Sequence, residues 1–369
     1  MKKAGIGKFL KILLIIILVP VIGYAGILGW LTAVEWKPKQ SEAASFISCD
    51  AGSAGELRPG DEQTMMTWNI GYGALGDNAD FVMDGGKMVN TADAARLEQN
   101  LGFIEDVISD ISPDFLLVQE IDRNSYRSHG TDECVRFTSG GKVAFLNNSD
   151  SLFAYNFRCP FVPFPVPPIG KVNSGIFTAS VYPVSDGERI ALPSSFKWPV
   201  RIANLKRCLL VAHIPVADSD KMLTLINLHL EAYDSGEGKI AQTRLLTDIL
   251  DREADSGNYI IAGGDFNQIF SGVDNSAYPV MPGTWECGYI DEDDFDPSYS
   301  FYMDNSVPSC RSLDRPLSDA PDKTPAGFQY YVIDGFIVSD NIRVESVETR
   351  DYGFKATDHN PVVMTFALE

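Results

Sequence analysis

The 369-residue sequence predicts an α/β (α+β) fold that follows one N-terminal transmembrane helix. Three observations support this class. An uncharged stretch long enough to cross a bilayer lies near the start of the chain. After it, short apolar runs typical of buried strands end in polar residues, and helix-like stripes alternate with them. Hydrophobic and charged contents of 45% and 22% are those of a folded globular protein with a sizeable core.

Residues 12–34 carry no charge and form the predicted transmembrane anchor. Four lysines lie before this stretch, in a predicted cytoplasmic tail of residues 1–11, whereas two lysines, Lys37 and Lys39, follow it together with Glu35. This excess of positive charge predicts a single-pass membrane protein whose main domain is extracytoplasmic. An uncleaved anchor is favoured over a cleaved signal peptide, because the stretch exceeds the apolar region of most signal peptides. Residues 35–62 are small and polar, which predicts a linker, and residues 63–369 are predicted to form one domain.

The cysteines indicate no metal site, because none of them has CxxC spacing. Their even number is compatible with disulfides on the outer side of a membrane, and equally with buried free thiols. The six are Cys49, Cys134, Cys159, Cys208, Cys287 and Cys310.

The first part of the domain contains two predicted strands with a helix between them. Residues 63–69 form a strand that leaves Asn69 at its end, before a glycine-rich turn. An apolar stripe over residues 97–108 predicts an amphipathic helix that ends near Pro113. Residues 115–119 then form a fully apolar strand, which is followed directly by Glu120.

The middle of the domain is predicted to be a long loop, residues 124–171, followed by a strand, helix, strand unit. His229 lies on one face of the strand at residues 222–230, and residues 238–252 form the helix. The next strand ends at Asp265 and Asn267, which point the same way if the backbone stays extended. A simple turn closed by the Asp265 side chain is the alternative.

Two further polar groups lie near the C-terminus. Asp334 lies in the middle of an apolar run, residues 330–338, where a buried carboxylate requires a partner. Asp358 and His359 precede the closing strand, residues 362–366, and His359 is a natural partner for Asp334.

The residue types at these strand ends favour phosphate-ester chemistry. The sequence contains no serine nucleophile elbow and no Cys/His cluster, so neither acyl transfer nor a structural zinc site is indicated. Carboxylates such as Glu120 and Asp358 suit Mg²⁺, with Mn²⁺ or Ca²⁺ as alternatives. A metal and several hydrogen-bond donors can absorb the negative charge of a phosphoryl transition state, and an Asp–His pair can serve as an oriented base.

Six short motifs resemble those of the endonuclease/exonuclease/phosphatase superfamily, which has the deoxyribonuclease I-like fold. They occur in the order of that superfamily and cover roughly residues 63–369. The motifs are Thr67-Trp68-Asn69-Ile70, Gln119-Glu120-Ile121, Asn227-Leu228-His229-Leu230, Gly264-Asp265-Phe266-Asn267, Ile333-Asp334-Gly335-Phe336 and Asp358-His359-Asn360-Pro361. The resemblance implies a four-layered α/β sandwich, with two facing mixed β-sheets flanked by helices and a site at their shared rim.

The resemblance also implies a role for each residue. Glu120, with Asn69 and Asp358, would hold Mg²⁺. His359, oriented by Asp334, would act as general base or bind the scissile phosphate. Asp265 would position the attacking water or protonate the leaving oxygen. Asn267 and His229 would bind phosphoryl oxygens. Asn173 loosely matches a further segment that binds the phosphate in the superfamily.

The function that follows is a metal-dependent phosphodiesterase that acts on a lipid headgroup, such as that of sphingomyelin, or on nucleic acid. Alternatives are a phosphomonoesterase of the same fold or an inactive binding module, and no protein partner is implied. The formal net charge of −20 opposes non-specific binding of polyanions. A local basic strip is the exception that the sequence leaves open, and it would consist of Lys197, Arg201, Lys206 and Arg207.

Overall fold

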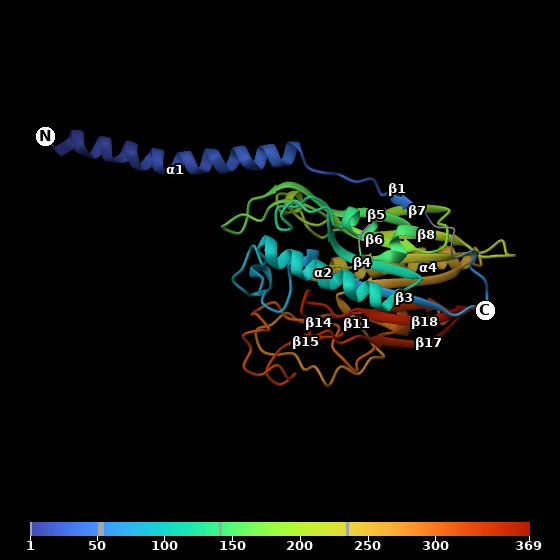
Figure 1. The fold of residues 1–369 in the computed structure, drawn as a ribbon. Helices are drawn as coiled ribbons and strands as arrows, with labels where there is room; N and C mark the ends of the chain where they lie inside the picture. The colour runs from blue at the N-terminus through green and yellow to red at the C-terminus, as the bar shows by residue number, and fades with distance from the viewer. Residues whose placement is uncertain (1, 51–54, 140–141, 234–235) are drawn as a thin grey trace.

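The structure, a computed structural model, describes residues 2–50, 55–139, 142–233 and 236–369. Met1 of the predicted tail and residues 51–54 of the predicted linker therefore lie outside the described residues. Two seven-stranded sheets form the body of the molecule (Figure 1). The strand order is β1-β7-β8-β9-β10-β16-β13 in sheet I and β17-β18-β3-β4-β6-β5-β2 in sheet II. Strands β9 and β10 run parallel, as do β3 and β4, so both sheets are mixed.

Sheet I contains β1 (Ser41–Ala43), β7 (Asp186–Ala191), β8 (Cys208–Pro215), β9 (Met222–His229), β10 (Tyr259–Asp265), β13 (Tyr299–Tyr302) and β16 (Asp334–Ser339). Sheet II contains β2 (Ser45–Cys49), β3 (Gln63–Asn69), β4 (Phe115–Asp122), β5 (Asp150–Val162), β6 (Gly170–Ser180), β17 (Ile342–Thr349) and β18 (Val362–Leu368). Two short pairs are β11 (Gln268–Phe270) with β12 (Gly288–Ile290), and β14 (Cys310–Arg311) with β15 (Tyr330–Tyr331). The helices are α1 (Lys2–Ala33), α2 (Ala94–Ile111), α3 (Glu133–Thr138) and α4 (Glu237–Asp255).

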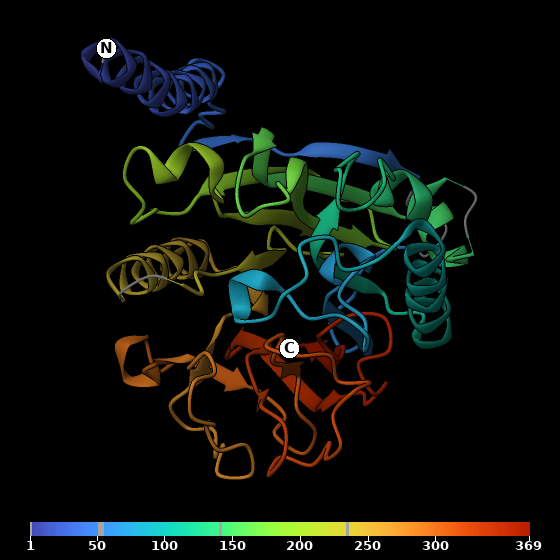
Figure 2. The same cartoon turned by 90° about the vertical axis from the view of Figure 1, so that its left-hand side faces the viewer.

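Three apolar clusters define four layers. Alternate residues of the central strands enter different clusters: Ile261 and Leu117 pack between the two sheets, Ile260 packs under α4, and Leu116 packs under α2. These strands are apolar on both faces because each sheet is covered on both sides. Figure 2 shows α4 and α2 on opposite sides of the two sheets. The predicted four-layered α/β sandwich with two facing mixed sheets is confirmed.

The start and end of α2 follow from local sequence. The Asp93 side chain accepts a hydrogen bond from the backbone nitrogen of Arg96 at 2.8 Å, which caps the first turn. Ser112 has a left-handed backbone at the C-terminal end, directly before Pro113. The predicted stripe of the helix is buried against sheet II.

Two segments predicted to lack regular structure contain strands of the two sheets. Residues 35–62 are not a free linker, because β1 pairs with β7 and β2 pairs with β5. Residues 124–171 are not one long loop, because they contain α3, β5 and the start of β6. The β5–β6 hairpin was missed because prolines interrupt its apolar pattern near the tip. Strand β2 was missed because an edge strand has one partner and needs little apolar sequence.

The predicted strand over residues 330–338 is divided in two. Tyr330–Tyr331 pairs with β14, and β16 begins at Asp334. Asp334 therefore lies at the start of a strand rather than in its middle.

Helix α1 projects from the domain, and its stretch Phe9–Ala33 is long and apolar enough to cross a membrane (Figure 1). Its role as an anchor remains a prediction. All six cysteines fall within the described residues, and each has a free thiol.

Gly264 provides a test of the packing at the end of β10. Its φ is +148°, and a β-carbon there would lie 2.0 Å from the carbonyl oxygen of Leu228 on β9. We expect Gly264→Ala to lower the free energy of unfolding by about 2–4 kcal/mol, measured by urea denaturation, through this clash and the strained backbone.

Gly102→Ala is the matched control. Gly102 lies within α2, and its added methyl group would come no closer than 3.8 Å to the Lys142 amine. This change is expected to stabilise the protein by about 0.5–1 kcal/mol, as alanine does within helices. Equal effects of the two substitutions would contradict the role assigned to Gly264.

Candidate active site

The predicted polar residues come from both sheets and meet at one end of the sandwich. Asn69 ends β3 and Glu120 lies near the end of β4, the parallel pair of sheet II. His229 ends β9 and Asp265 ends β10, the parallel pair of sheet I. Because parallel strands point the same way, each pair delivers its side chains to one edge, and the facing sheets bring the two edges together.

Asp334 reaches the same edge from an antiparallel strand. It begins β16 and lies directly opposite Asp265 in the register of the two strands. Two carboxylates in a cross-strand pair repel each other unless one is protonated or a cation lies between them. The pairing of β10 and β16 therefore concentrates negative charge at this point.

His359 forms a close pair with Asp334. Its Nδ1 lies 2.8 Å from Oδ2 of Asp334, which also accepts a hydrogen bond from the Ser309 hydroxyl at 2.7 Å. Burial alone lowers the pKa of His359, but the charge of Asp334 outweighs this and holds the pKa well above its ordinary value. The imidazole is therefore cationic at neutral pH, and its Nε2 faces the centre of the site.

Asp265 lies at that centre. Its Oδ2 accepts a hydrogen bond from Nδ2 of Asn69 at 3.0 Å and lies 3.4 Å from Nε2 of His229 and 3.7 Å from Nε2 of His359. Burial, with the charge of Asp334, raises the pKa of Asp265 to about 7. A carboxyl group with this pKa can accept and release a proton near neutral pH.

Glu120 is placed by an irregularity in β4. Its φ is +54°, and the register between β4 and β6 shifts between Gln119 and Ile121. Such a bulge turns one side chain away from the alternating directions of its neighbours in the strand. The backbone strain that this requires is found most often at functional sites. The Glu120 carboxylate lies 3.3 Å from Nδ2 of Asn69 and 4.0 Å from Nε2 of His229, and burial raises its pKa.

His229 differs from His359 in its charge. Burial, with the nearby Arg207 and His359, lowers its pKa well below the ordinary value, so the ring is neutral. Its Nε2 faces Asp265, and its buried Nδ1 makes no hydrogen bond within the described part of the chain. The site thus combines one cationic and one neutral imidazole around the same carboxylate.

Asn267 does not extend the strand as its spacing with Asp265 predicted. Its φ is +51°, so β10 ends at Asp265 and the two side chains diverge. The backbone nitrogen of Asn267 donates to Oδ1 of Asp265 at 2.9 Å, and its side-chain amide donates to the carbonyl of Leu230 at 2.9 Å. The alternative of a turn closed by Asp265 is therefore correct here, although Asn267 still lines the cavity of the site.

Asn69 and Asn173 are placed less favourably for their predicted roles. The oxygen of the Asn69 amide accepts from the backbone nitrogen of Gly71 at 3.1 Å, and its nitrogen faces the carboxylates. A metal-binding role would require the amide to turn over. Asn173 does not line the cavity, whereas its neighbour Ser174 does, because successive side chains of a strand point to opposite faces.

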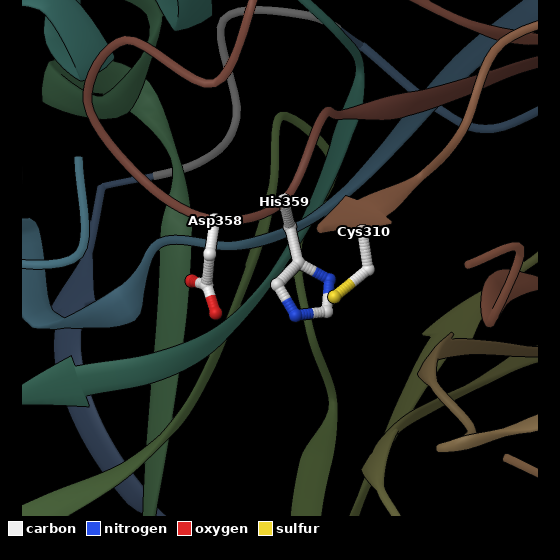
Figure 3. Close-up of side chains that lie close together, drawn as sticks. All are labelled: Cys310, Asp358 and His359. Atoms are coloured by element: carbon white, nitrogen blue, oxygen red, sulfur yellow. The ribbon is translucent and has the colours of Figure 1, made fainter. Parts of the chain in front are cut away.

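Sequence reasoning missed the contribution of residues 309–311. These residues pair through their backbone with the segment before β18. The backbone nitrogen of Arg311 donates to the carbonyl of Asp358 at 2.9 Å, and Cys310 forms an isolated antiparallel β-bridge with His359. Figure 3 shows the Cys310 thiol beside the His359 ring, with the Asp358 carboxylate on the other side. The surrounding sequence, residues 268–329, has no periodicity that could have indicated this placement.

The oxygen-rich set fits a hard divalent cation. The pKa values of Glu120, Asp265 and Asp358 are all raised by burial, and Oδ1 of Asp334 is buried without a hydrogen bond among the described residues. A cation would offset this excess of buried negative charge. Two groups of possible ligand atoms lie within 4.8 Å of one another, Cys310 with Asp358 and His359, and Asp265 with Asp334 and His359. Burial raises the pKa of Cys310 to about 12, so its protonated thiol is a poor ligand.

Comparison with known families identifies the chain. A sequence model described as the Endonuclease/Exonuclease/phosphatase family matches residues 66–359, which is most of the chain. The chain belongs to this family. Members of the endonuclease/exonuclease/phosphatase family are phosphoester hydrolases, typically dependent on a divalent metal, which supports a hydrolase here. No curated protein matches the sequence.

Solved structures share the fold of the family at low sequence identity. An endonuclease/exonuclease/phosphatase from Beutenbergia cavernae DSM 12333 matches with a TM-score of 0.53 and 19% identity, over 83% of this chain and 72% of that chain. The human Nocturnin catalytic domain with bound sulfate matches with a TM-score of 0.49 and 15% identity, over 88% of this chain and 97% of that chain. At these identities the likeness concerns the fold alone.

The raised pKa of Asp265 predicts how the stability of the metal-free protein depends on pH. Below its ordinary pKa of 3.8 the carboxyl group is neutral in both the folded and the unfolded protein. Above a pH of about 7 it is charged in both, and burying this charge in the folded protein costs up to about 4 kcal/mol, at roughly 1.4 kcal/mol per pKa unit. In EDTA, Asp265→Asn should therefore melt at a higher temperature than the parent at pH 8, and this gain should shrink as the pH falls toward 4.

The control for this measurement is Asp296→Asn. The Asp296 carboxyl is fully exposed, and hydrogen bonds from Ser298 lower its pKa, so its removal cannot stabilise the protein at high pH. A gain from Asp265→Asn that stays constant from pH 4 to pH 8 would contradict the assigned pKa.

Proposed function

We propose that the chain is a membrane-anchored, extracytoplasmic phosphodiesterase that depends on a divalent metal. The observation that carries this proposal is the arrangement around Asp265. A cationic His359 held by Asp334 and a neutral His229 approach the same carboxylate, and Glu120 lies on the side of His229. This arrangement offers both a base for water and donors for phosphoryl oxygens.

The reaction needs a deprotonated water and stabilisation of the charge that gathers on the phosphoryl oxygens. Asp265 orients the water and accepts its proton, since its pKa of about 7 suits transfer near neutral pH. His359 donates a hydrogen bond from Nε2 to a phosphoryl oxygen, because its raised pKa keeps this atom protonated. The raised pKa thus favours the phosphate-binding role of His359 over its alternative role as general base.

The neighbouring residues orient these two groups. The Asp334 carboxylate fixes the His359 ring through Nδ1, and the Ser309 hydroxyl holds that carboxylate in place. Asn69 holds Asp265. His229 presents a neutral ring that can hydrogen-bond a phosphoryl oxygen, and Asn267 contributes through the turn that positions Asp265.

Glu120 and Asp358 are the residues we propose to hold the metal, which in this family is commonly Mg²⁺, with Mn²⁺ or Ca²⁺ as alternatives. When bound, the metal supplies electrophilic stabilisation of the phosphoryl oxygens. Asn69 would join this set only if its amide turned over. Both residues offer carboxylate oxygens, which are the ligands that hard divalent cations prefer.

A diester is favoured over a monoester by the charges that line the cavity. Its three arginines are already engaged: Arg127 with Asp122, Arg207 with the His229 carbonyl, and Arg311 with the carbonyls of Leu75, Gly76 and Ala79. A phosphate monoester is a dianion and would bring a second negative charge among buried carboxylates. A diester brings only one.

The experiment measures hydrolysis of bis(p-nitrophenyl) phosphate by the full chain in detergent micelles, with Mg²⁺ or with EDTA. We expect Mg²⁺-dependent cleavage, and a loss of about 10²-fold or more in kcat/KM for both His359→Ala and Glu120→Gln. Asp296→Asn is the control, since this exposed loop carboxylate should not affect the rate.

Thermal melting gives a second readout of metal binding. Mg²⁺ should raise the melting temperature of the parent and of His359→Ala, because a ligand that binds only the folded state stabilises it. The same addition should have little effect on Glu120→Gln. Full Mg²⁺-dependent activity in Glu120→Gln would overturn the proposal.

A further inference from the structure

The polar site is one end of a larger cavity that is mainly apolar. The cavity has a volume of about 770 Å³, within the range of about 300–1,000 Å³ that is usual for small-ligand sites. Much of its apolar wall comes from three elements: the last turns of α1, the tip of the β5–β6 hairpin, and the short 3₁₀ helix η4 (Val200–Ala203). Representative lining residues are Tyr24, Leu28, Leu31, Phe164, Ile169 and Ile202. A site built for a free ionic phosphodiester would not need such walls.

The C-terminal turn of helix α1 is fixed against the domain by specific contacts. Leu31 is only 3% exposed and packs with Phe157 and Ile202. The Trp198 indole donates to the Thr32 hydroxyl at 3.2 Å. Directly after the helix, the buried Glu35 carboxylate is paired with Arg201 at 3.3 Å and with Lys206 at 3.2 Å.

These ion pairs engage part of the basic strip that the sequence left open for nucleic acid. Arg201 and Lys206, two of the four predicted members, both pair with the single carboxylate of Glu35, and Arg207 is buried. Three of the four side chains of the predicted strip are thus paired or buried, which disfavours a nucleic-acid backbone along this strip.

The hairpin tip and α1 extend on the same side of the molecule as the candidate active site. In Figure 1, α1 runs to the left above the β5–β6 hairpin, whose tip points in the same direction. The loops that carry β14 and β15, which contribute Cys310, Arg311 and Tyr331 to the cavity, lie at the same left-hand end. Figure 2 views this end directly. A bilayer crossed by α1 would therefore face the mouth of the cavity.

Apolar side chains are exposed around this mouth. The exposed fractions are 57% for Phe164, 84% for Val166, 53% for Trp198 and 57% for Val200. The rings of Phe164 and Tyr24 of α1 lie 6.3 Å apart. Large apolar groups gathered in this way mark a contact surface, and aromatic residues are favoured where a bilayer meets water.

We infer that the substrate is the phosphodiester of a lipid in the same bilayer that holds α1. The inference rests on the proposed function and names its substrate class. The acyl chains would lie between α1 and the hairpin, and the phosphodiester between Glu120 and His359. Water forms a bond to phosphorus, the bond from phosphorus to one alcohol oxygen breaks, and that oxygen takes the proton that Asp265 removed from the water. The products are an alcohol and a phosphate monoester.

The test reconstitutes the full chain into vesicles of phosphatidylcholine and phosphatidylglycerol, and into vesicles that also contain sphingomyelin. Lipid hydrolysis is followed by mass spectrometry of both products, with bis(p-nitrophenyl) phosphate and plasmid DNA assayed on the same vesicles. We expect Mg²⁺-dependent cleavage of at least one lipid. We also expect two hairpin variants, the double substitution Phe164→Ser with Val166→Ser and the single substitution Val166→Glu, to lower the ratio of lipid to soluble-diester hydrolysis at least tenfold.

Tyr289→Ser is the matched control, because Tyr289 is 62% exposed but does not line the cavity. It should leave this ratio at the parent's value. Cleavage of the soluble diester or of DNA without cleavage of any lipid would overturn the inference and leave the proposed function intact. The same conclusion would follow if lipid were cleaved but both hairpin variants kept the parent's ratio of lipid to soluble-diester hydrolysis. Failure to cleave any phosphodiester would overturn both.

Discussion

The close packing of two sheets is the constraint on which the rest of the structure depends. No half of the molecule contains a complete site: Asn69, Glu120 and His359 belong to sheet II and its connections, and His229 and Asp265 belong to sheet I. Beneath the site the side-chain amide of Gln119 donates to that of Asn227 at 2.8 Å and joins the sheets directly. A buried polar contact of this kind fixes the position of one sheet relative to the other, which apolar packing alone does less strictly.

This arrangement stores unfavourable energy at the site. Asp265 and Asp334 face each other across two strands, and Glu120 and Asn267 have left-handed backbones that non-glycine residues seldom adopt. Each feature costs free energy that the three apolar clusters must offset. The same features direct the polar side chains into one cavity. The free energy that they cost is therefore associated with the geometry of the candidate site and not with a packing defect.

The sequence predicted the parts of the molecule that follow from periodicity and strand ends. Asn69, Glu120, His229 and Asp265 could be found because each follows an apolar strand, and the order of six motifs related them to one fold. Asn267 could not be placed, because spacing alone does not reveal a positive φ. Cys310 and Arg311 could not be found either, since their position depends on a backbone pairing with Asp358 and His359 in an aperiodic segment. The edge strands β1 and β2 were hidden for a related reason, because pairing rather than composition defines them.

The buried Glu35 cluster has a consequence for how the protein would meet its substrate. A span joined to its domain by a flexible tether lets the domain turn in all directions, whereas the contacts of Glu35 with Arg201 and Lys206 fix the orientation at the end of α1. A catalytic domain held in this way would search a surface rather than a volume. Its rate would depend on the fraction of substrate within its own leaflet and on lateral diffusion there, and dilution of the surrounding solution would leave that rate unchanged.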